Sequence, residues 1–476
     1  MANLRSFLLL VGALLPTISA APKPASRSMA RSDNVLEDAS STESHLRWVS
    51  DLHARNTGKR DTTAGIEKTY EISGWKAYAG EFDDATIAGI KASPEVAYVE
   101  ADVLVPAPKL LNEQKTAPLD TLEKRHLLAQ PDAEWGLVAI SHRSTSSSSD
   151  YVFDSVAGQG MYAYVVDDSI RTTHMEFENR ATFGFNAISN NNTPSGDHGS
   201  FTAGIIGGIY AGVAKNVRFI FQESTSSLYT ITLILRDSTN VVTFPKGRNI
   251  HQSSSMTTSL SQSSAFPLTA IQTNQKPQIN LISVKVFDER GASPDSVILS
   301  GYTWAVNDIL SKNRTNKAVI NLSLGSGNTG IEQAWVDAIT AAYNQNILTT
   351  VSAGNDAAHV SQHSPANVLL AVTVAASNKS FTIADFSNYG PGVDFFAPGV
   401  GILAAASDSD VSGLYADGTS ASAPFVAGVA MYLQSIWGLE SSDYLVAALK
   451  GWGAARMVGK LKNSPNLFVN NGNGVD

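Results

Sequence analysis

The amino-acid sequence predicts an α/β protein: a parallel twisted sheet flanked by helices, preceded by a small α+β domain. Over the last two thirds of the chain, short apolar runs alternate with longer segments of helical pattern. Strands that are apolar throughout are typical of a parallel sheet whose two faces are both covered. With 476 residues and 43% hydrophobic content, the chain can form one large core with accessory segments.

Composition excludes several classes of function. The net charge of −9, the pI of about 5.5 and the lack of a basic stripe argue against nucleic acid as a partner. The chain has no cysteine, so it has neither disulfides nor a catalytic thiol. We expect a monomer that does not insert into a membrane.

Residues 1–20 have the pattern of a secretory signal peptide. Arg5 precedes the apolar stretch Leu8–Leu15, and small residues lead to Ala20, where cleavage is expected. The apolar stretch is too short to cross a bilayer. The sequence therefore predicts a secreted, extracellular protein.

A second unit is expected over residues 21–125. Its first part, residues 21–41, is polar and predicted to be disordered. Strand patterns follow at 70–80 and 96–105, with a helical pattern at 84–91 between them.

Residues 106–130 have the composition of a charged, proline-containing linker. Within it, Lys124-Arg125 is a candidate dibasic processing site. Cleavage of the chain by itself elsewhere, between about residues 105 and 131, is the alternative.

Ser420 is the candidate nucleophile. It lies among small residues in Asp417–Pro424, at the start of an apolar helical run. A helix N-terminus supplies backbone N–H groups without partners and a positive dipole end, which suits a reaction whose product oxygen is negative. An ordinary helix cap is the alternative when Ser420 is taken alone.

Three upstream residues are candidate partners of this serine. Asp167 ends the strand-like run 161–166, His198 opens a glycine-rich apolar helix, and Asn355 follows the strand-like run 347–351. The order of acid, base and nucleophile is one of those found in serine peptidases. Singly, each residue could serve as a cap or turn. Jointly, they indicate a catalytic site.

These motifs resemble the subtilisin-like serine peptidases, in particular the secreted fungal branch similar to proteinase K. The resemblance covers about residues 130–470, with one interruption. Other segments that carry it are Ala163–Asp167, Ile170–His174, Glu176–Glu178, Ile282–Phe287, Ile320–Gly325, Phe386–Gly390, Phe396–Gly399 and Ser464–Leu467. It implies a subtilisin-like catalytic domain over residues 126–476 and a propeptide inhibitor domain over 21–125.

The resemblance also implies a mechanism. The protein would be a serine endopeptidase, made as a precursor that its own propeptide inhibits, with polypeptides as substrates. Ser420 would attack, His198 would act as base, Asp167 would orient the base, and Asn355 would stabilise the oxyanion.

Small residues are expected to bind the substrate. The implied peptide-pairing residues are Gly291, Ala292, Ser293, Ser323, Leu324 and Gly325. The implied pocket walls are Ser352, Ala353 and Gly354, which favour an apolar or aromatic residue before the cut. A catalytically weak or inactive scaffold is the alternative function.

Four residues depart from the family pattern: Asp168 and Ser169 stand where relatives have Thr or Ser and then Gly, Phe201 where they have His, and Ala421 where they have Met. A second carboxylate beside Asp167 raises the proton affinity of the pair, so the acid limb of activity is expected at higher pH than in relatives.

No cofactor is required for the chemistry. By resemblance, a structural calcium ion is expected at Asp394, with the carbonyls of Leu369 and Ala371 as further ligands. A surface aspartate without metal is the alternative.

Residues 217–278 interrupt the resemblance. This segment has 62 residues, 20 of them Ser or Thr, and a loop of this length is uncommon inside a compact domain. One hypothesis is a translated intron, because Val217-Arg218 and Gln278 can be encoded by splice-donor and splice-acceptor sequences. A genuine surface loop is the alternative, since loop-closure entropy grows slowly with length.

Overall fold

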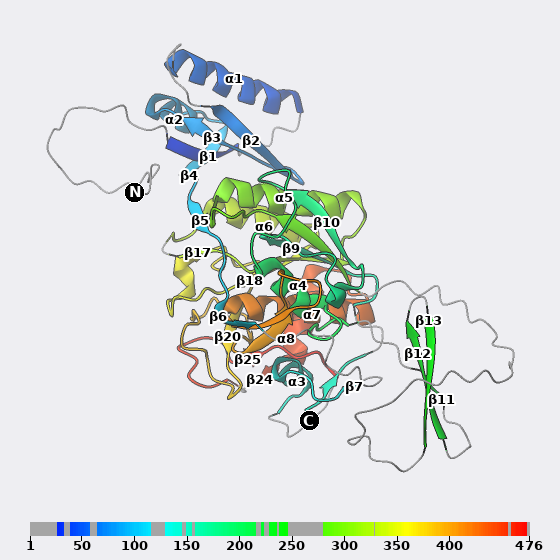
Figure 1. The fold of residues 1–476 in the computed structure, drawn as a ribbon. Coiled ribbons are helices and arrows are strands. Elements are labelled where there is room, and N and C mark those ends of the chain that lie inside the picture. The colour runs from blue at the N-terminus through cyan, green and yellow to red at the C-terminus, as the bar shows by residue number, and fades with distance from the viewer. Residues whose placement is uncertain are drawn as a thin grey trace.

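The fold is that of a computed structural model (Figure 1). It describes residues 26–32, 39–57, 64–115, 129–144, 149–154, 158–215, 220–222, 228–235, 238–245, 279–327, 329–455 and 458–473. The predicted signal peptide and the Lys124-Arg125 pair lie outside these residues.

The N-terminal domain is a four-stranded antiparallel sheet with two helices. Its elements are β1 (Ser26–Ser32), α1 (Ala39–Thr57), β2 (Gly65–Ile72), β3 (Trp75–Phe82), α2 (Asp84–Lys91) and β4 (Val96–Ala101). The strand order is β2-β3-β1-β4. The small apolar core under the helices contains Val49, Tyr78, Phe82, Ile87 and Ile90.

Some of the elements predicted for this domain are confirmed and others are wrong. The helix at 84–91 is confirmed, and Asp83 caps it by accepting a hydrogen bond of 2.8 Å from the Thr86 N–H. The single strand predicted at 70–80 is wrong, because a turn at Ser73-Gly74 makes a hairpin of β2 and β3. The disorder predicted for 21–41 is also wrong in part: β1 is polar in sequence but pairs with both β3 and β4.

The larger domain, which was predicted above to be catalytic, is built on a nine-stranded sheet. Its strands, in spatial order, are β10 (Ala181–Asn186), β14 (Asn280–Lys285), β9 (Tyr162–Asp167), β16 (Ala318–Leu322), β18 (Leu348–Ser352), β20 (Val372–Ser377), β21 (Phe395–Pro398), β25 (Leu467–Phe468) and β24 (Ala454–Ala455). All neighbours are parallel except the last pair. The predicted fold class is therefore confirmed.

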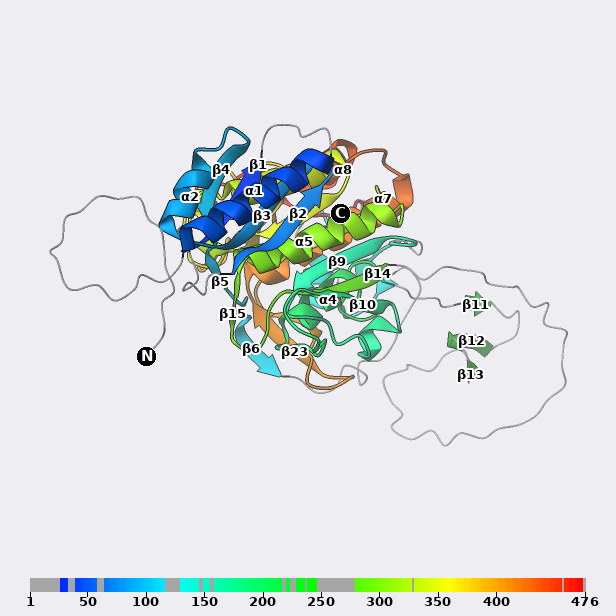
Figure 2. The same cartoon turned by 90° about the horizontal axis from the view of Figure 1, so that it is seen from above.

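Helices cover the sheet. They are α3 (Trp135–Ser141), α4 (His198–Gly207), α5 (Asp295–Ser311), α6 (Gln333–Asn344), α7 (Thr419–Trp437) and α8 (Ser442–Trp452), with short 3-10 turns η3 (Met175–Phe177) and η4 (Val360–Gln362). Helix α4 packs against α7, and α5 packs against α6. Figures 1 and 2 show α5 between the main sheet and the N-terminal domain, whose β2 contacts both α5 and α6.

Small sheets join the two domains. Strand β5 (Leu104–Pro106) pairs with β15 (Ala292–Pro294), and β6 (Leu111–Lys115) pairs with β23 (Gly413–Asp417), which pairs with β22 (Ile402–Ala405). The prediction of a plain linker at 106–130 is thus wrong for β6. Two further pairs are β7 (Ala129–Gln130) with β8 (Tyr151–Val152) and β17 (Ser326–Gly327) with β19 (His363–Ser364).

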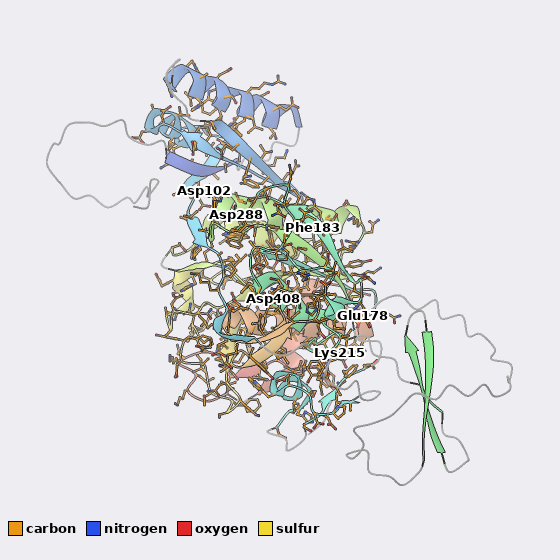
Figure 3. All side chains as sticks on the ribbon, viewed as in Figure 1. Asp102, Glu178, Phe183, Lys215, Asp288 and Asp408 are labelled. Carbon is orange, nitrogen blue, oxygen red and sulfur yellow. The ribbon has the colours of Figure 1, made fainter. Side chains whose placement is uncertain are left out.

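The segment 217–278 contains β11 (Ile220–Gln222), β12 (Leu228–Leu235) and β13 (Ser238–Pro245). These strands form an antiparallel sheet of their own, which stands apart from the catalytic domain in Figures 1 and 2. The segment begins just after Lys215, labelled in Figure 3, and returns at the amino end of β14. A Cβ on Gly158 would lie 2.7 Å from the Ala214 Cβ and 3.5 Å from the Ile279 Cβ, so the two ends of the segment are close together.

Candidate active site

Asp167 and His198 are brought together by two different elements. Asp167 ends β9 at the carboxyl edge of the parallel sheet, where such sheets bind ligands, and His198 is the first residue of α4. The His198 Nδ1 lies 2.9 and 2.8 Å from the two oxygens of Asp167. Both side chains are buried, and the Asp168 N–H also donates to Asp167 at 2.8 Å.

Electrostatics at His198 favour its charged form. Burial alone would lower the pKa of His198, but the charge and hydrogen bonds of Asp167 and the charges of Asp168 and Glu113 outweigh burial and raise that pKa. With Nδ1–H directed at Asp167, Nε2 is the nitrogen that can accept a proton.

Ser420 is the second residue of α7 and is buried. Its hydroxyl donates to the Ser323 carbonyl at 3.3 Å, and the Ser323 hydroxyl donates to the Ser420 carbonyl at 3.0 Å. The Nε2 of His198 is buried and has no hydrogen-bond partner among the residues that the structure describes. Base and nucleophile are therefore not hydrogen-bonded to one another in this state of the chain.

Asn355 lies beside the N-terminus of α7. Its Oδ1 accepts hydrogen bonds from the Thr419 N–H at 2.9 Å and the Thr419 hydroxyl at 2.8 Å. A Cβ on Gly418 would lie 3.6 Å from Asn355 Nδ2 and 3.8 Å from Ser420 Cβ. The amide nitrogen and Ser420 thus flank Gly418. Thr419, which holds the amide, was not singled out from sequence; the only signal was a hydroxyl next to the nucleophile.

The four departures from the family pattern are all buried. Asp168 accepts a hydrogen bond of 2.7 Å from the Gly199 N–H, in the first turn of α4. Burial and the charge of Asp167 raise the pKa of Asp168 to about 7, against the opposing effects of His198 and of the helix N–H groups. Phe201 and Ala421 are part of the apolar core.

The chain's own β5 occupies part of the predicted substrate edge. Ser293 faces Val105 and Ala292 faces Pro106 in an antiparallel pair, and the Gly291 carbonyl accepts the Ala107 N–H at 2.9 Å. Leu324 and Gly325 follow β16 next to Ser323, whose contacts with Ser420 are given above.

The predicted pocket walls follow from β18. Ser352 ends this strand, Ala353 is fully buried, and Gly354 has a φ of +102°. A Cβ on Gly354 would lie 2.3 Å from Asn388 Nδ2, so a side chain cannot be accommodated there. Asn388 itself donates to the Ala353 carbonyl at 2.8 Å and was missed from sequence.

Strand β6 pairs with β23, the strand that ends at Asp417 just before α7. Leu111 faces Asp417, the Asn112 amide donates to the Asp417 carboxylate, and Glu113 acts electrostatically on His198. The polar sequence of β6 did not predict that this segment would form a strand beside the candidate active site.

Asp394 is already paired with a cation. One of its oxygens lies 3.2 Å from Lys450 Nζ, and the other accepts the Thr373 N–H at 3.0 Å. Calcium prefers six to eight oxygen ligands, and no cluster of three His, Cys, Asp or Glu occurs in the described part of the chain. The Lys450 ammonium would compete with a cation for this carboxylate, and the calcium site with the carbonyls of Leu369 and Ala371 stays a prediction.

Carboxylates gather where the N-terminal domain meets α5 and α6. Glu100 accepts hydrogen bonds of 3.0 Å from the Gln333 and Ala334 N–H groups, and Asp102, labelled in Figure 3, accepts the Ser296 N–H at 2.9 Å. Both therefore cap helix N-termini. Asp295 is buried beside them. Its Oδ1 accepts the indole N–H of Trp335 at 2.8 Å, and its Oδ2 has no hydrogen-bond partner within the described part of the chain.

Comparison with known proteins agrees with this architecture. Residues 158–448 match the subtilase family, and residues 28–107 match the peptidase inhibitor I9 family. The chain is 36% identical to the alkaline proteinase of Hapsidospora chrysogena over all of both chains. It is 35% identical to alkaline protease 1 of Emericella nidulans over 99% of both chains, and 34% identical to subtilisin-like proteinase Mp1 of Magnaporthiopsis poae over 99% of both.

Among solved structures, that of a cold adapted subtilisin-like serine proteinase has a TM-score of 0.54 and 25% identity, covering 71% of this chain and 98% of that one. The fold and site define a serine endopeptidase with an inhibitory N-terminal domain. The chain belongs to the subtilase family. None of the helices in its described part is both long and apolar enough to span a bilayer.

Proposed function

We propose that the protein is a secreted endopeptidase in which Ser420 is the nucleophile, His198 the general base and Asp167 the residue that orients the base. The observation that carries the proposal is the pair of hydrogen bonds, at 2.9 and 2.8 Å, between His198 Nδ1 and Asp167. They fix the tautomer whose Nε2 can take a proton from a serine.

In this mechanism the Ser420 oxygen attacks the scissile carbonyl while His198 takes its proton and then gives it to the leaving amine. Asp167 stabilises the charged imidazole. The oxyanion is stabilised by the Asn355 amide and by the Ser420 N–H, which belongs to the first turn of α7, where backbone N–H groups have no intrahelical acceptor. Loss of one such donor typically costs about 2.7–4 kcal/mol of transition-state stabilisation.

The substrate is a polypeptide that pairs with Gly291–Ser293 and Ser323–Gly325 as an added strand. The small residues Ser352–Gly354 leave room for an apolar or aromatic side chain before the cut. The signal-like residues 1–20 support secretion, and residues 21–125 act as an intramolecular inhibitor until they are removed.

A fluorophosphonate probe tests the proposal on processed protein. Label is expected on Ser420 and absent from Ser420→Ala. Ser422→Ala is the matched control, because Ser422 lies in the same turn and its hydroxyl donates to the backbone carbonyls of 397 and 398. Labelling must survive in that control.

The alternative is a folded scaffold with weak or no activity. It is favoured by one observation, the hydrogen bond of the Ser420 hydroxyl to Ser323 instead of His198. Folded, processed protein that takes no label would decide for it.

A further inference from the structure

The chain contains four Asn-x-Ser/Thr triplets, which begin at Asn191, Asn313, Asn321 and Asn378, and none of them has proline in the middle position. Such a triplet is the acceptor for an N-linked oligosaccharide in a chain that enters the secretory pathway. The oligosaccharide is bulky and hydrophilic, so a folded protein can carry it only on an asparagine at the surface. Burial and hydrogen bonding therefore decide which of the four triplets are compatible with this fold.

Asn321 lies inside β16 and is fully buried. Its Nδ2 donates to the Ser323 hydroxyl at 3.0 Å, and its Oδ1 accepts the Thr350 hydroxyl at 3.1 Å. The Ser323 hydroxyl, which belongs to the third residue of the triplet, donates in turn to the Ser420 carbonyl. A sugar on Asn321 would disrupt the core of the sheet beside the candidate nucleophile, so the folded protein cannot carry one there.

Two further triplets use the asparagine oxygen to hold their own turns. The Asn191 Oδ1 accepts the Thr193 N–H at 3.0 Å. The Asn378 Oδ1 accepts the N–H groups of Ser380 and Thr382 at 3.0 and 3.1 Å, and Asn378 is half-buried. These side chains are already committed to local structure, so neither is the best acceptor on this fold.

Asn313 differs from the other three asparagines. Its side chain is exposed and makes no hydrogen bond among the residues that the structure describes. It lies just beyond α5, which ends at Ser311, and it has a φ of +52°, a left-handed conformation that asparagine adopts more readily than most residues. Its backbone N–H donates to the Leu310 carbonyl at 3.1 Å. Asn313 therefore presents an unengaged amide in a defined surface turn.

The middle residue of this triplet fixes the turn in place. The Arg314 Nη1 donates to the Tyr164 hydroxyl and lies 3.2 Å from the Asp308 carboxylate. The same guanidinium lies over the Tyr162 ring, 3.9 Å from its centroid. None of these contacts involves the Asn313 side chain, so a sugar attached to it displaces no interaction that holds the turn.

We propose that Asn313 carries an N-linked oligosaccharide in the secreted protein and that Asn321 does not. The inference rests on the secretion proposed above. The Lys317 carbonyl, two residues beyond the triplet, accepts the N–H of Tyr162 at 2.8 Å, at the amino end of β9. Asp167 ends the same strand at its opposite end, so the sugar leaves the candidate active site accessible to a polypeptide.

The modification is a group transfer with a lipid-linked oligosaccharide pyrophosphate as the donor. The Asn313 Nδ2 forms a bond to the anomeric carbon of the first sugar as the bond from that carbon to the pyrophosphate oxygen breaks. The amide loses one proton, and the lipid pyrophosphate is the leaving group. No oxidant or reductant takes part, and Thr315 supplies the hydroxyl that the triplet requires.

Mass spectrometry of protein secreted from the full chain by a fungal host tests the proposal. Enzymatic removal of N-linked sugar in heavy-oxygen water converts the modified asparagine into a labelled aspartate. We expect this label at Asn313, and we expect the peptide that contains Asn321 to be recovered unmodified. A secreted protein without sugar on Asn313 would overturn the inference, as would sugar on Asn321.

Three variants separate the triplet from the stability of the turn. Asn313→Asp removes the acceptor nitrogen but keeps a side chain that tolerates the left-handed conformation. Thr315→Ala leaves Asn313 in place and removes the required hydroxyl, whereas Thr315→Ser keeps that hydroxyl. The first two should be secreted without the Asn313 sugar, and Thr315→Ser should retain it. Sugar at Asn313 in Thr315→Ala, or its loss in Thr315→Ser, would contradict the assignment.

The failure of this inference is distinguishable from that of the proposed function. If the protein is secreted and takes the fluorophosphonate label on Ser420 but has no sugar on Asn313, only this inference fails. If the chain stays inside the cell, the proposed secretion fails and the modification fails with it.

Discussion

The carboxylate of Asp168 accepts a hydrogen bond of 2.7 Å from the backbone N–H of Gly199, in the first turn of the helix that begins at His198. The residue that departs from the family pattern thus caps the helix that carries the candidate base. It also adds a negative charge beside Asp167 and raises the pKa of His198.

Asp168→Asn is expected to move the acid limb of kcat/KM to lower pH, by roughly one pH unit. His198 must be neutral to act as base, and removal of a nearby negative charge lowers the pKa of its imidazolium. The asparagine oxygen can still accept the Gly199 N–H, so the helix cap is kept. A pH–rate profile of processed enzyme measures the shift. An unchanged limb in both Asp168→Asn and Asp168→Thr would rule the effect out.

The same substitution has a stability signature. Burial raises the pKa of Asp168 to about 7 in the folded chain. The contribution of the protonated carboxyl to the free energy of unfolding is therefore complete at acid pH and is lost as pH rises through 7. Asp168→Asn should therefore be more stable than the parent above pH 7 and should lose this advantage at low pH. Thermal unfolding of a Ser420→Ala background at several pH values checks the sign.

Release of the N-terminal domain should depend on pH. Burial raises the pKa of Glu100 to about 7, and the negative charges of Glu332 and Asp337 add to this rise. The hydrogen bonds from the N–H groups of Ala334 and Gln333 oppose it. Once exposed, Glu100 returns to an ordinary pKa of about 4.3. Binding is therefore strongest when Glu100 is protonated, and weakens as pH rises between these values.

Once the precursor has been cleaved, the N-terminal domain should be held roughly tenfold to a hundredfold more tightly at pH 5 than at pH 8. Burial also raises the pKa of Asp295, and the negative charges of Glu332 and Asp102 raise it further. This shift makes binding pH-dependent in the same direction as that of Glu100. Recovery of peptidase activity after dilution at each pH measures release. Glu100→Gln should flatten the pH dependence, whereas Glu43→Gln, on an exposed part of α1, should not. A parent enzyme that releases the domain equally at pH 5 and 8 would refute this.

A chain that lacks residues 217–278 should fold and retain activity. A Cβ on Gly158 would lie 2.7 Å from the Ala214 Cβ and 3.5 Å from the Ile279 Cβ, so the chain can be closed between these two residues without a long bridge. Each halving of loop length lowers the entropic cost of closing the loop by about 0.6 kcal/mol. The free energy of unfolding should therefore not fall when the segment is removed. Comparison of Tm and fluorophosphonate labelling between the two chains tests this. Sequencing of the spliced message separately tests the intron hypothesis.

A chelator should not destabilise the enzyme through Asp394. The Lys450 ammonium already compensates this carboxylate, and the pair is partly exposed, so Lys450→Met should lower Tm by no more than about 3 °C. Thermal unfolding with and without a calcium chelator measures both effects. A large drop with chelator that disappears in Asp394→Asn would establish the calcium site instead.

The sequence predicted the structure best where apolar strands are buried and reactive side chains stand at the ends of clear elements. The apolar strands β9, β14, β16 and β18 and the helices that begin near His198 and Ser420 were predictable because parallel strands are buried on both faces. Asp167 and His198 could be expected to meet, because each follows a clear element boundary.

What sequence did not reveal depends on partners far along the chain. Strands β1 and β6 are polar, and only pairing with distant strands makes them strands. Thr419 holds Asn355 through contacts that no periodicity encodes. Lys450 reaches Asp394 from α8, a pairing that required the three-dimensional fold.

The position of residues 217–278 has a practical consequence. The chain leaves α4 with the Val213 and Ala214 N–H groups bonded to carbonyls of 205 and 206, and it returns through Asn280, whose N–H donates to the Met161 carbonyl. Both stems are thus anchored in the core, at the amino ends of the strands and opposite to the edge where Asp167 ends β9. A foreign domain placed between Asn216 and Ile279 would lie on the side of the enzyme opposite to the candidate active site. It would therefore leave the approach of a protein substrate free.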